Sequence, residues 1–303
     1  MRLIMQCEVT PMIDYDKPID QKRALAVHDI SGVGKCSLTV ALPIISAAGV
    51  ECSVLPTAVL STHTGGFTGY TCRDLTDDII PMVRHWQSLK VKFDAIYTGY
   101  LGSFNQVQLM KKMVNDLSNK DTLVLVDPVM GDNGRLYAAF NEAFPPEMLE
   151  LCRVANIIKP NMTEACFLLG EKYTDGPYSR EYIDDILTRL AVITEKPSIV
   201  LTGAWLEDDP DHLGAATFDR STGQIDYILG PTVEGSYHGT GDVFGSAIVG
   251  AALTGHSVAE SVRIAVDFTV RAIRLTHAAG TEIRYGVNFE ACLGSYIKDL
   301  GLC

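Results

Sequence analysis

Residues 235–250 read GSYHGTGDVFGSAIVG: two glycines bracket Thr240, Asp242 follows at once, and small and apolar residues suited to a buried helix complete the stretch. Gly239 and Gly241 can adopt backbone angles that residues with a Cβ avoid, so their N–H groups can converge on one point. A helix that begins near Asp242 adds its unpaired N-terminal N–H groups and the positive end of its dipole. The stretch therefore predicts an anion site, best suited to a phosphate.

Asp242 directly follows this predicted anion site. A carboxylate there is poorly placed to bind an anion but well placed to take a proton from a group that attacks it, as phosphoryl transfer requires. The alternative is a simple turn followed by an N-cap, because aspartate is a favoured capping residue. A dinucleotide-binding fingerprint is rejected, because Gly245 falls one position late and the motif lies near the end of the chain.

Apolar runs that end in a polar residue or a glycine recur along the chain. Strands are predicted for residues 24–29, 50–59, 93–97, 122–126, 154–158 and 198–201. The other expected elements are a glycine turn at 31–34, a helix over 35–48, a polar loop at 60–67, an edge hairpin within 215–229, and helices over 242–253 and 257–278. This repeat predicts an α/β fold, a three-layer α/β/α sandwich with a doubly wound, mostly parallel sheet, whose functional loops lie along one edge.

Four carboxylates fall at or just after expected strand ends, namely Asp127, Asp132, Glu164 and Asp242. Several acids in one cleft are costly unless a cation compensates them. Mg²⁺ prefers oxygen ligands, keeps much of its water and bridges to substrate phosphates, so a few acids acting directly or through water are enough. Together with the glycine anion site, these acids indicate a site for a magnesium-bound nucleotide.

The composition is that of a globular protein with a large core. Of the 303 residues, 47% are hydrophobic and 20% charged. The net charge is −12 and Lys and Arg form no cluster, so we expect neither a nucleic acid nor an anionic membrane as a partner. No apolar run approaches the length that spans a bilayer.

The N-terminal residues are rich in acids and lack the apolar core of a signal peptide. We predict an N-terminal extension over residues 1–22 and one domain over residues 23–303. None of the eight cysteines forms a C-x-x-C pair, and most lie in apolar runs. They are expected to be buried thiols in a reducing cytosol.

Three separated motifs resemble the signature set of the ribokinase-like kinases, namely DPVMGD at 127–132, NMTE at 161–164 and GTGD at 239–242. Within that superfamily, STHTG at 61–65 and TGYL at 98–101 are similar to the substrate loops of the pyridoxal (vitamin B6) kinases. Residues 28–34 lie where both these kinases and the hydroxymethylpyrimidine kinases carry their first substrate-binding loop. The resemblance covers nearly the whole chain from about residue 24.

The resemblance implies a role for each matching residue in an ATP-dependent kinase that uses Mg²⁺. Asp242 would be the general base that takes the proton from the substrate hydroxymethyl group. Charge on the transferring phosphoryl group would be stabilised by Gly239, Thr240 and Gly241. The nucleotide and its metal would be bound by Asp127, Asn161, Glu164, Thr202 and Gly203, with Asp127 and Glu164 serving the metal. The substrate would face His28, Ser31, His63, Thr64 and Tyr100; in the first loop His28, Asp29 and Ser31 are alternatives for the same contact.

The implied activity is phosphorylation of the 5′-hydroxymethyl group of pyridoxal, pyridoxine or pyridoxamine, by a cytoplasmic homodimer. One alternative is a hydroxymethylpyrimidine kinase of thiamine synthesis, but relatives of that type often carry cysteine at the position of Asp242. Another is a non-catalytic binder of B6 vitamers with the same fold, against which the intact Asp242 argues.

Two further segments carry expectations from the resemblance. Where many relatives have Thr-Pro-Asn, this chain has Lys159-Pro-Asn. The threonine position is associated with a monovalent cation, and the lysine ammonium could replace that ion. Residues 131–137 are polar, contain two glycines and could fold over the site to exclude water.

Overall fold

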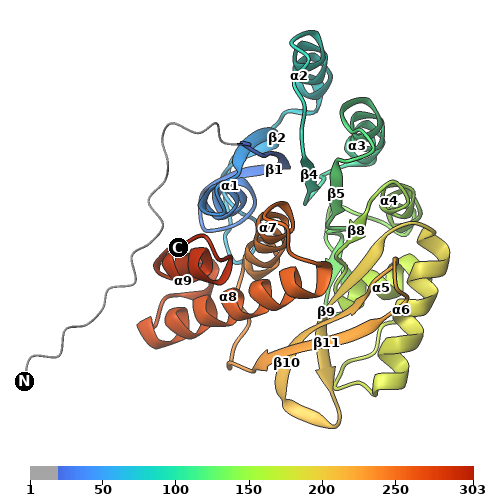
Figure 1. Cartoon of the computed structure of the whole chain (residues 1–303), viewed down its shortest axis with the longest axis vertical. Coiled ribbons are helices and arrows are strands. Elements are labelled where there is room, and N and C mark those ends of the chain that lie inside the picture. Colours follow the sequence, from blue (N-terminus) through green and yellow to red (C-terminus); the bar gives the residue numbers. More distant parts are fainter. Residues whose placement is uncertain (1–19) are drawn as a thin grey trace, which may run out of the picture.

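The computed structural model describes residues 20–303, and within them nine strands form one sheet in the order β11-β10-β9-β8-β5-β4-β1-β2-β3 (Figure 1). These strands are β1 (Arg23–Val33), β2 (Glu51–Thr62), β3 (Cys72–Asp74), β4 (Ala95–Thr98), β5 (Leu123–Val126), β8 (Ile157–Ile158), β9 (Ser198–Leu206), β10 (Asp209–Phe218) and β11 (Ile225–Pro231). The strands from β2 to β9 in the sheet order pair in parallel. At the edges, β3, β10 and β11 pair antiparallel.

Helices cover both faces of the sheet (Figure 1). One face carries α2 (Thr76–Ser88), α3 (Phe104–Leu117), α4 (Phe144–Cys152), α5 (Met162–Leu169) and α6 (Arg180–Thr194). The other carries α1 (Leu38–Ala47), α7 (Thr240–Leu253), α8 (Val258–Ala279) and α9 (Leu293–Asp299), with the 3₁₀ turns η1 (Ile283–Tyr285) and η2 (Phe289–Cys292). The predicted three-layer α/β/α architecture with a mostly parallel sheet is confirmed.

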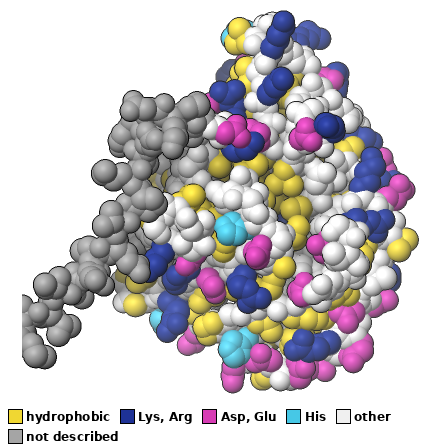
Figure 2. Space-filling view, in the orientation of Figure 1, with side chains coloured by type: hydrophobic (Ala, Val, Ile, Leu, Met, Phe, Trp, Pro, Cys, Tyr) yellow, Lys and Arg dark blue, Asp and Glu magenta, His cyan; other side chains and the backbone are white. Residues whose placement is uncertain are grey.

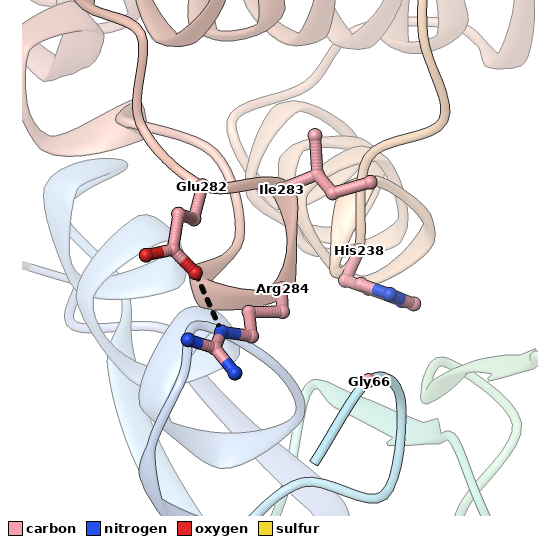
Figure 3. A pocket seen from close by; sticks show the side chains of 5 residues that line it. All are labelled: Gly66, His238, Glu282, Ile283 and Arg284. Atoms are coloured by element: carbon pink, nitrogen blue, oxygen red, sulfur yellow. Dashed lines mark ion pairs between the residues drawn. The ribbon is translucent and has the colours of Figure 1, made fainter.

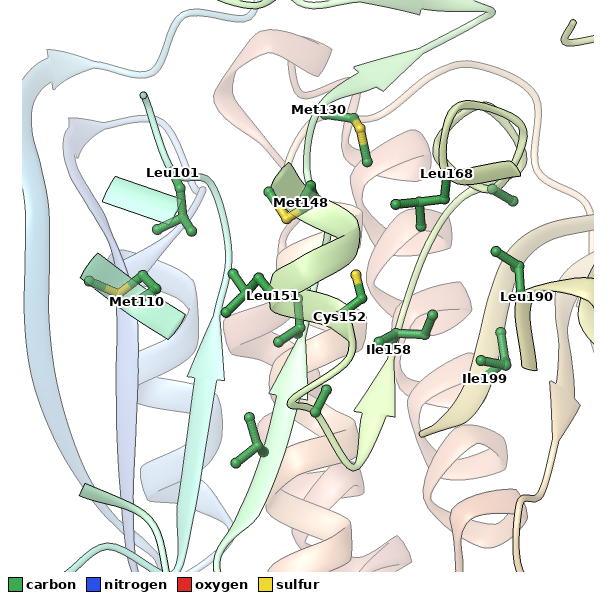
Figure 4. Packing of buried hydrophobic residues seen from close by; sticks show 14 of the residues in the cluster. Leu101, Met110, Met130, Met148, Leu151, Cys152, Ile158, Leu168, Leu190 and Ile199 are labelled. Atoms are coloured by element: carbon green, nitrogen blue, oxygen red, sulfur yellow. The ribbon is translucent and has the colours of Figure 1, made fainter. Parts of the chain in front are cut away.

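The two faces of the sheet hold two separate apolar cores. Successive residues of a strand point to opposite faces, and in β1 Leu25 and Val27 pack with α2–α6 while Ala24 and Ala26 pack with α1, α7 and α8. Figure 4 shows the first core, where side chains of α3, α4, α5 and α6 meet those of β8 and β9. Burial on both faces explains why the central strands are almost wholly apolar.

The second core includes a close approach between α7 and its neighbours at Gly250. A Cβ at Gly250 would overlap the Tyr296 hydroxyl, which donates to the Ala247 carbonyl oxygen at 3.2 Å, and would lie 2.8 Å from the Cβ of Ala48. We therefore expect Gly250→Ala to lower the free energy of unfolding by about 1–3 kcal/mol, measured by urea denaturation.

The matched control is Gly294→Ala in α9, where a Cβ would meet no atom within 4 Å. Alanine is preferred to glycine in a helix interior, so this control should be neutral or slightly stabilising. Equal effects of the two substitutions would contradict the packing argument.

Several predicted boundaries were wrong. The structure has no glycine turn at 31–34, because β1 continues through Val33 by pairing with the far end of β2. Accordingly, α1 begins at Leu38, and β2 runs to Thr62 through the start of the predicted loop at 60–67. Separately, β9 continues to Leu206, because it pairs with β10. Two elements were not predicted, namely β3 and the small hairpin of β6 (Gly131–Asp132) and β7 (Arg135–Leu136). The edge hairpin of β10 and β11 is confirmed.

The seven described cysteines are free thiols. Burial is confirmed for Cys152, Cys166 and Cys292 but is wrong for Cys72, on the edge strand β3, and for Cys303, the last residue. Cys7 lies outside the described residues. Among residues 20–303, no helix is long and apolar enough to cross a membrane. Acidic and basic side chains are interspersed over the face drawn in Figure 2.

Candidate active site

The parallel strands end at one edge of the sheet, and the polar residues that follow them meet there. His28 lies on β1, Tyr100 follows β4, Asp127 follows β5 and Lys159 follows β8. Thr202 lies within β9, next to this edge, and forms a β-bridge with Asn161. The order of the strands thus gathers residues that are far apart in the sequence, as expected for a doubly wound sheet.

The N-terminus of α7 faces this edge. Gly239 is the N-cap residue with φ +76°, and a Cβ there would overlap the Lys35 carbonyl oxygen, so only glycine fits. The helix begins at Thr240, two residues before the predicted start, and the Thr240 hydroxyl donates to the Tyr237 carbonyl oxygen at 3.1 Å. Among the described residues no side chain caps this helix, so the first N–H groups of α7 are available to an anion.

Asp242 lies in the first turn of α7 with a side chain that is 18% exposed. Its Oδ2 accepts a hydrogen bond from the Ser37 backbone N–H at 2.8 Å, and its Oδ1 lies 3.8 Å from His28 Nδ1. Burial raises the pKa of the Asp242 carboxyl, while the Ser37 N–H and the positive charge of Lys159 oppose the rise. A carboxylate with a raised pKa is a better proton acceptor than an ordinary one.

His28 is fully buried beside this base. Within the described residues, neither of its ring nitrogens has a hydrogen-bond partner, and its ring packs edge-on against Tyr97 at a centroid distance of 4.4 Å. Burial lowers the pKa of His28 to about 4, so the ring is neutral at pH 7 and does not form an ion pair with Asp242.

Lys159 and Asp127 form a buried ion pair, with Lys159 Nζ 2.7 Å from Asp127 Oδ2. Burial raises the pKa of Asp127, and the lysine opposes this rise. For Lys159, burial alone would lower the pKa, but the carboxylates of Asp127, Glu164 and Asp242 together outweigh it and the pKa is raised. A Cβ on Gly241 would lie 3.8 Å from Lys159 Nζ. A fixed positive charge thus lies beside the N-terminus of α7.

Asn161 and Glu164 form a capping box at the start of α5. The Glu164 carboxylate accepts from the backbone N–H groups of Asn161 at 2.9 Å and Met130 at 3.1 Å. The Asn161 side chain accepts from the Glu164 N–H at 2.8 Å and donates to the Gly131 carbonyl oxygen at 3.0 Å. Burial raises the pKa of Glu164, and the charge of Asp127 raises it further. These bonds join the start of α5 to the segment after β5.

A cavity of about 300 Å³ lies between β9, α5 and the hairpin of β6 and β7. Three of the expected nucleotide-binding residues line it, namely Asn161, Thr202 and Gly203, whereas Asp127 and Glu164 are buried and do not line it. Its other walls include Asp132, Asn133, Tyr173 and Trp205. The hairpin is held by the Gly134 N–H, which donates to Thr163 Oγ1 at 2.9 Å. The segment expected to cover the site therefore forms one wall of this cavity.

A second cavity, of about 490 Å³, is lined by Gly66, His238, Glu282, Ile283 and Arg284 (Figure 3). His63 lies behind it: its Nδ1 accepts from the Gly65 N–H at 3.1 Å, and its Nε2 lies 2.6 Å from the Arg284 carbonyl oxygen. These contacts fit the tautomer with the proton on Nε2. His238, which the sequence analysis assigned no role, lines the cavity, and its ring centroid is 5.4 Å from that of His63.

The remaining expected substrate residues differ in accessibility. Thr64 is exposed, and Tyr100 is half-buried with its ring 5.6 Å from that of Phe140. Ser31 is fully buried and its hydroxyl donates to Asp29 Oδ2 at 3.1 Å. The structure therefore brings Thr64 and Tyr100, but not the Ser31 hydroxyl, to the molecular surface.

A doubly wound sheet with a buried carboxylate in the first turn of a helix at its edge is the arrangement expected of the ribokinase-like phosphotransferases. The chain belongs to the phosphomethylpyrimidine kinase family, whose model matches residues 42–287. The ribokinase-like fold and the relationship to the pyridoxal kinases, both predicted from the motifs, are confirmed by this match and by the similar proteins below.

Similar proteins include kinases of vitamin B6. A Bacteroides thetaiotaomicron protein assigned as a phosphomethylpyrimidine kinase, solved in a crystal form with pyridoxal, is 37% identical with a TM-score of 0.84, over 91% of this chain and 96% of that one. The pyridoxal kinase of Lactobacillus plantarum is 30% identical with a TM-score of 0.84, over 91% and 97%. The pyridoxine/pyridoxal/pyridoxamine kinase of Bordetella pertussis is 26% identical over 276 residues, 82% of this chain and 87% of its own.

Proposed function

We propose that this protein is an ATP-dependent kinase that phosphorylates the 5′-hydroxymethyl group of pyridoxal, pyridoxine or pyridoxamine. The observation that carries the proposal is the Asp242 carboxylate, held at the N-terminus of α7 with a raised pKa and one oxygen on the Ser37 N–H. The crystal form of the Bacteroides thetaiotaomicron relative with pyridoxal supports a pyridine as the substrate.

In this proposal Asp242 takes the proton of the hydroxymethyl group while the hydroxymethyl oxygen attacks the γ-phosphorus of ATP, the bond from that phosphorus to the bridging oxygen breaks, and ADP leaves. The N–H groups of the N-cap residue Gly239 and of Thr240 and Gly241, the first residues of α7, stabilise the charge on the transferring phosphoryl group. Lys159 adds a positive charge that is already in place before the substrates bind, so no reorganisation is needed during the reaction. Phosphoryl transfer depends mainly on such positioning and charge neutralisation.

The nucleotide is assigned to the cavity lined by Asn161, Thr202 and Gly203. Mg²⁺ would neutralise the phosphates there. Among the described residues, no group of three His, Cys, Asp or Glu side chains is arranged to hold a metal directly, and both oxygens of Glu164 already accept backbone hydrogen bonds. The buried carboxylates of Asp127 and Glu164 nevertheless fit a dication that keeps its water shell, because each has a pKa that burial raises and a cation would lower.

Lys159 can supply the positive charge that the family resemblance assigns to a monovalent cation. Its ammonium already neutralises Asp127 beside the anion site. We therefore propose that turnover does not require K⁺.

The substrate ring is assigned to the space around His28, His63, Thr64 and Tyr100. His28 is fully buried, as Ser31 is, but both of its ring nitrogens are unpartnered within the described residues, so they remain open to a hydrogen bond from a ligand. We also propose a homodimer, a cytoplasmic location, and a single domain over residues 23–303 after an extension over residues 1–22, most of which lies outside the described residues.

The test is ATP consumption by the purified protein with Mg²⁺, offering pyridoxal, pyridoxine, pyridoxamine and hydroxymethylpyrimidine in parallel. We expect turnover with at least one pyridine, and equal turnover with K⁺ or with a tetraalkylammonium salt. Turnover with the pyrimidine alone would assign the protein to thiamine synthesis and leave the roles of Asp242 and Lys159 standing. Binding of a vitamer without any turnover would favour a non-catalytic binder.

A further inference from the structure

Ser37 has a backbone conformation that serine rarely adopts. Its φ is +57° and its ψ is −131°, a region in which glycine is preferred and other residues are strained. Strain of this kind costs about 1–3 kcal/mol and persists only where the surrounding structure enforces it. In this conformation the Ser37 N–H donates to Asp242 Oδ2 at 2.8 Å, across 205 residues of sequence.

Ser37 is held against β1 by its backbone, which forms an isolated β-bridge with Ile30, and by its side chain. Ser37 precedes α1 as its N-cap residue, but its hydroxyl makes no capping bond. By contrast, the serines before α3, α6 and α8 each accept a hydrogen bond from a backbone N–H of their helix. The Ser37 hydroxyl instead donates to Asp29 Oδ1 at 2.7 Å, and both residues are buried.

Asp29 is itself placed by an irregularity in the sheet. The pairing of β1 with β2 shifts register between His28 and Ile30, and such a bulge re-aims a side chain. The second oxygen of Asp29 accepts from the Ser31 hydroxyl at 3.1 Å, so both carboxylate oxygens are bound. Burial raises the pKa of Asp29, and the Ser37 hydroxyl opposes this rise.

We propose that Asp29 and Ser37 are positioning residues for the catalytic base. Asp29 holds the Ser37 side chain, Ser37 thereby keeps its strained backbone, and the Ser37 N–H fixes one oxygen of Asp242. The other oxygen, Oδ1, is left to accept the substrate proton. This inference rests on the proposed role of Asp242 as the general base.

The contact also sets the proton affinity of the base. The charged and titratable groups near Asp242 are those of His28, Asp29, Cys36, His63, Tyr97, Asp127, Tyr137 and Lys159. Among them His28 is neutral, and burial raises the pKa of the Cys36 thiol far above its usual range. The Ser37 N–H lowers the pKa of Asp242 against the effect of burial. Loss of this hydrogen bond should therefore raise the pKa of Asp242.

Two substitutions of Ser37 test whether its hydroxyl is needed to hold the strained backbone conformation. Ser37→Ala removes the bond to Asp29 and leaves a residue that avoids φ +57°, so the N–H should turn away from Asp242. Ser37→Gly also removes the hydroxyl, but glycine adopts this φ without strain and can keep the N–H in place. We expect kcat to fall about 10- to 100-fold in Ser37→Ala, less in Ser37→Gly, with KM for ATP and pyridoxal nearly unchanged.

Asp29→Asn tests the other member of the pair. Its amide can accept from one hydroxyl where the carboxylate accepts from two, so kcat should fall in the same direction. The control is Ser257→Ala at the start of α8, which removes an ordinary N-cap. It should cost about 1 kcal/mol of stability and leave kcat unchanged.

The deciding readout is the pKa of Asp242, which a purely structural role of Ser37 would not move. It is measured by NMR titration of ¹³C-labelled aspartate in the protein without ligands, with the Asp242 signal assigned by its absence in Asp242→Asn. We expect a higher pKa in Ser37→Ala than in the wild type and Ser37→Gly, and the same upward shift in the acid limb of the kcat/KM profile. An unchanged pKa in a folded Ser37→Ala protein would overturn the proposal.

This titration needs no turnover, so it decides the Ser37 contact even if the kinase proposal fails. Absence of turnover in the wild type would refute the proposed function alone. Equal losses of kcat in Ser37→Ala and Ser37→Gly would overturn the idea that Asp29 holds a strained backbone.

Discussion

Asp242→Asn should lower kcat for phosphate transfer to pyridoxal by about 10²–10⁴-fold, the usual contribution of a positioned general base. Asparagine keeps an oxygen that can accept from the Ser37 N–H, so the local geometry should survive. It cannot take up the substrate proton, however. Steady-state kinetics and calorimetric binding of ATP and pyridoxal measure the two properties separately, and we expect both ligands still to bind.

The matched control is Asp121→Asn, an aspartate exposed in the turn before β5, which should leave kcat unchanged. A fully active Asp242→Asn enzyme would remove Asp242 from the chemistry. It would leave the fold and the family assignment untouched.

Lys159→Met should have a comparably large effect, on stability as well as on activity. Methionine can fill much of the space of the lysine stem but leaves the buried Asp127 carboxylate without its cation. Removing one partner of a buried ion pair typically costs about 3–5 kcal/mol. We therefore expect a large loss in the free energy of unfolding by urea, together with a fall in kcat because the charge beside Gly241 is gone.

The double substitution Asp127→Asn with Lys159→Met separates the loss of stability from the fall in kcat. It removes both charges, so stability should largely return while kcat stays low. Lys111→Met is the control for stability, since Lys111 and Glu150 form an exposed pair that should contribute at most about 1 kcal/mol. Recovery of kcat in the double variant would show that the ammonium has no role in the reaction.

The fold class could be predicted from the sequence because the parallel strands are short, apolar and followed by polar residues. The predicted strand boundaries were less accurate where the end of a strand forms only because another segment of the chain pairs with it. Residues 31–33 resemble a glycine turn, yet they lie in β1 because the end of β2 pairs with them. Local preference was overridden there by contacts that no short window of sequence contains.

The candidate site was partly predictable for the same reason. The acids after the strands were found from their positions, and the Asn161-x-x-Glu164 spacing is itself the signature of a capping box, which the sequence analysis did not use. Ser37 gave no such signal. A serine before a helix looks like an ordinary N-cap, and its partner in the site lies 205 residues away.

The site joins the two ends of the described chain. Ser37 contacts Asp242, and Lys35 Nζ, 253 residues from its partner, donates to Asn288 Oδ1 at 3.0 Å. During synthesis, a chain that has emerged only as far as β9 holds every parallel strand of the sheet but not α7. Domains begin to fold as they emerge from the ribosome, so the sheet can form before the base exists. If Asp242 is the general base, as we propose, an unfinished chain of this kind lacks that base and should not consume ATP before α7 has been made.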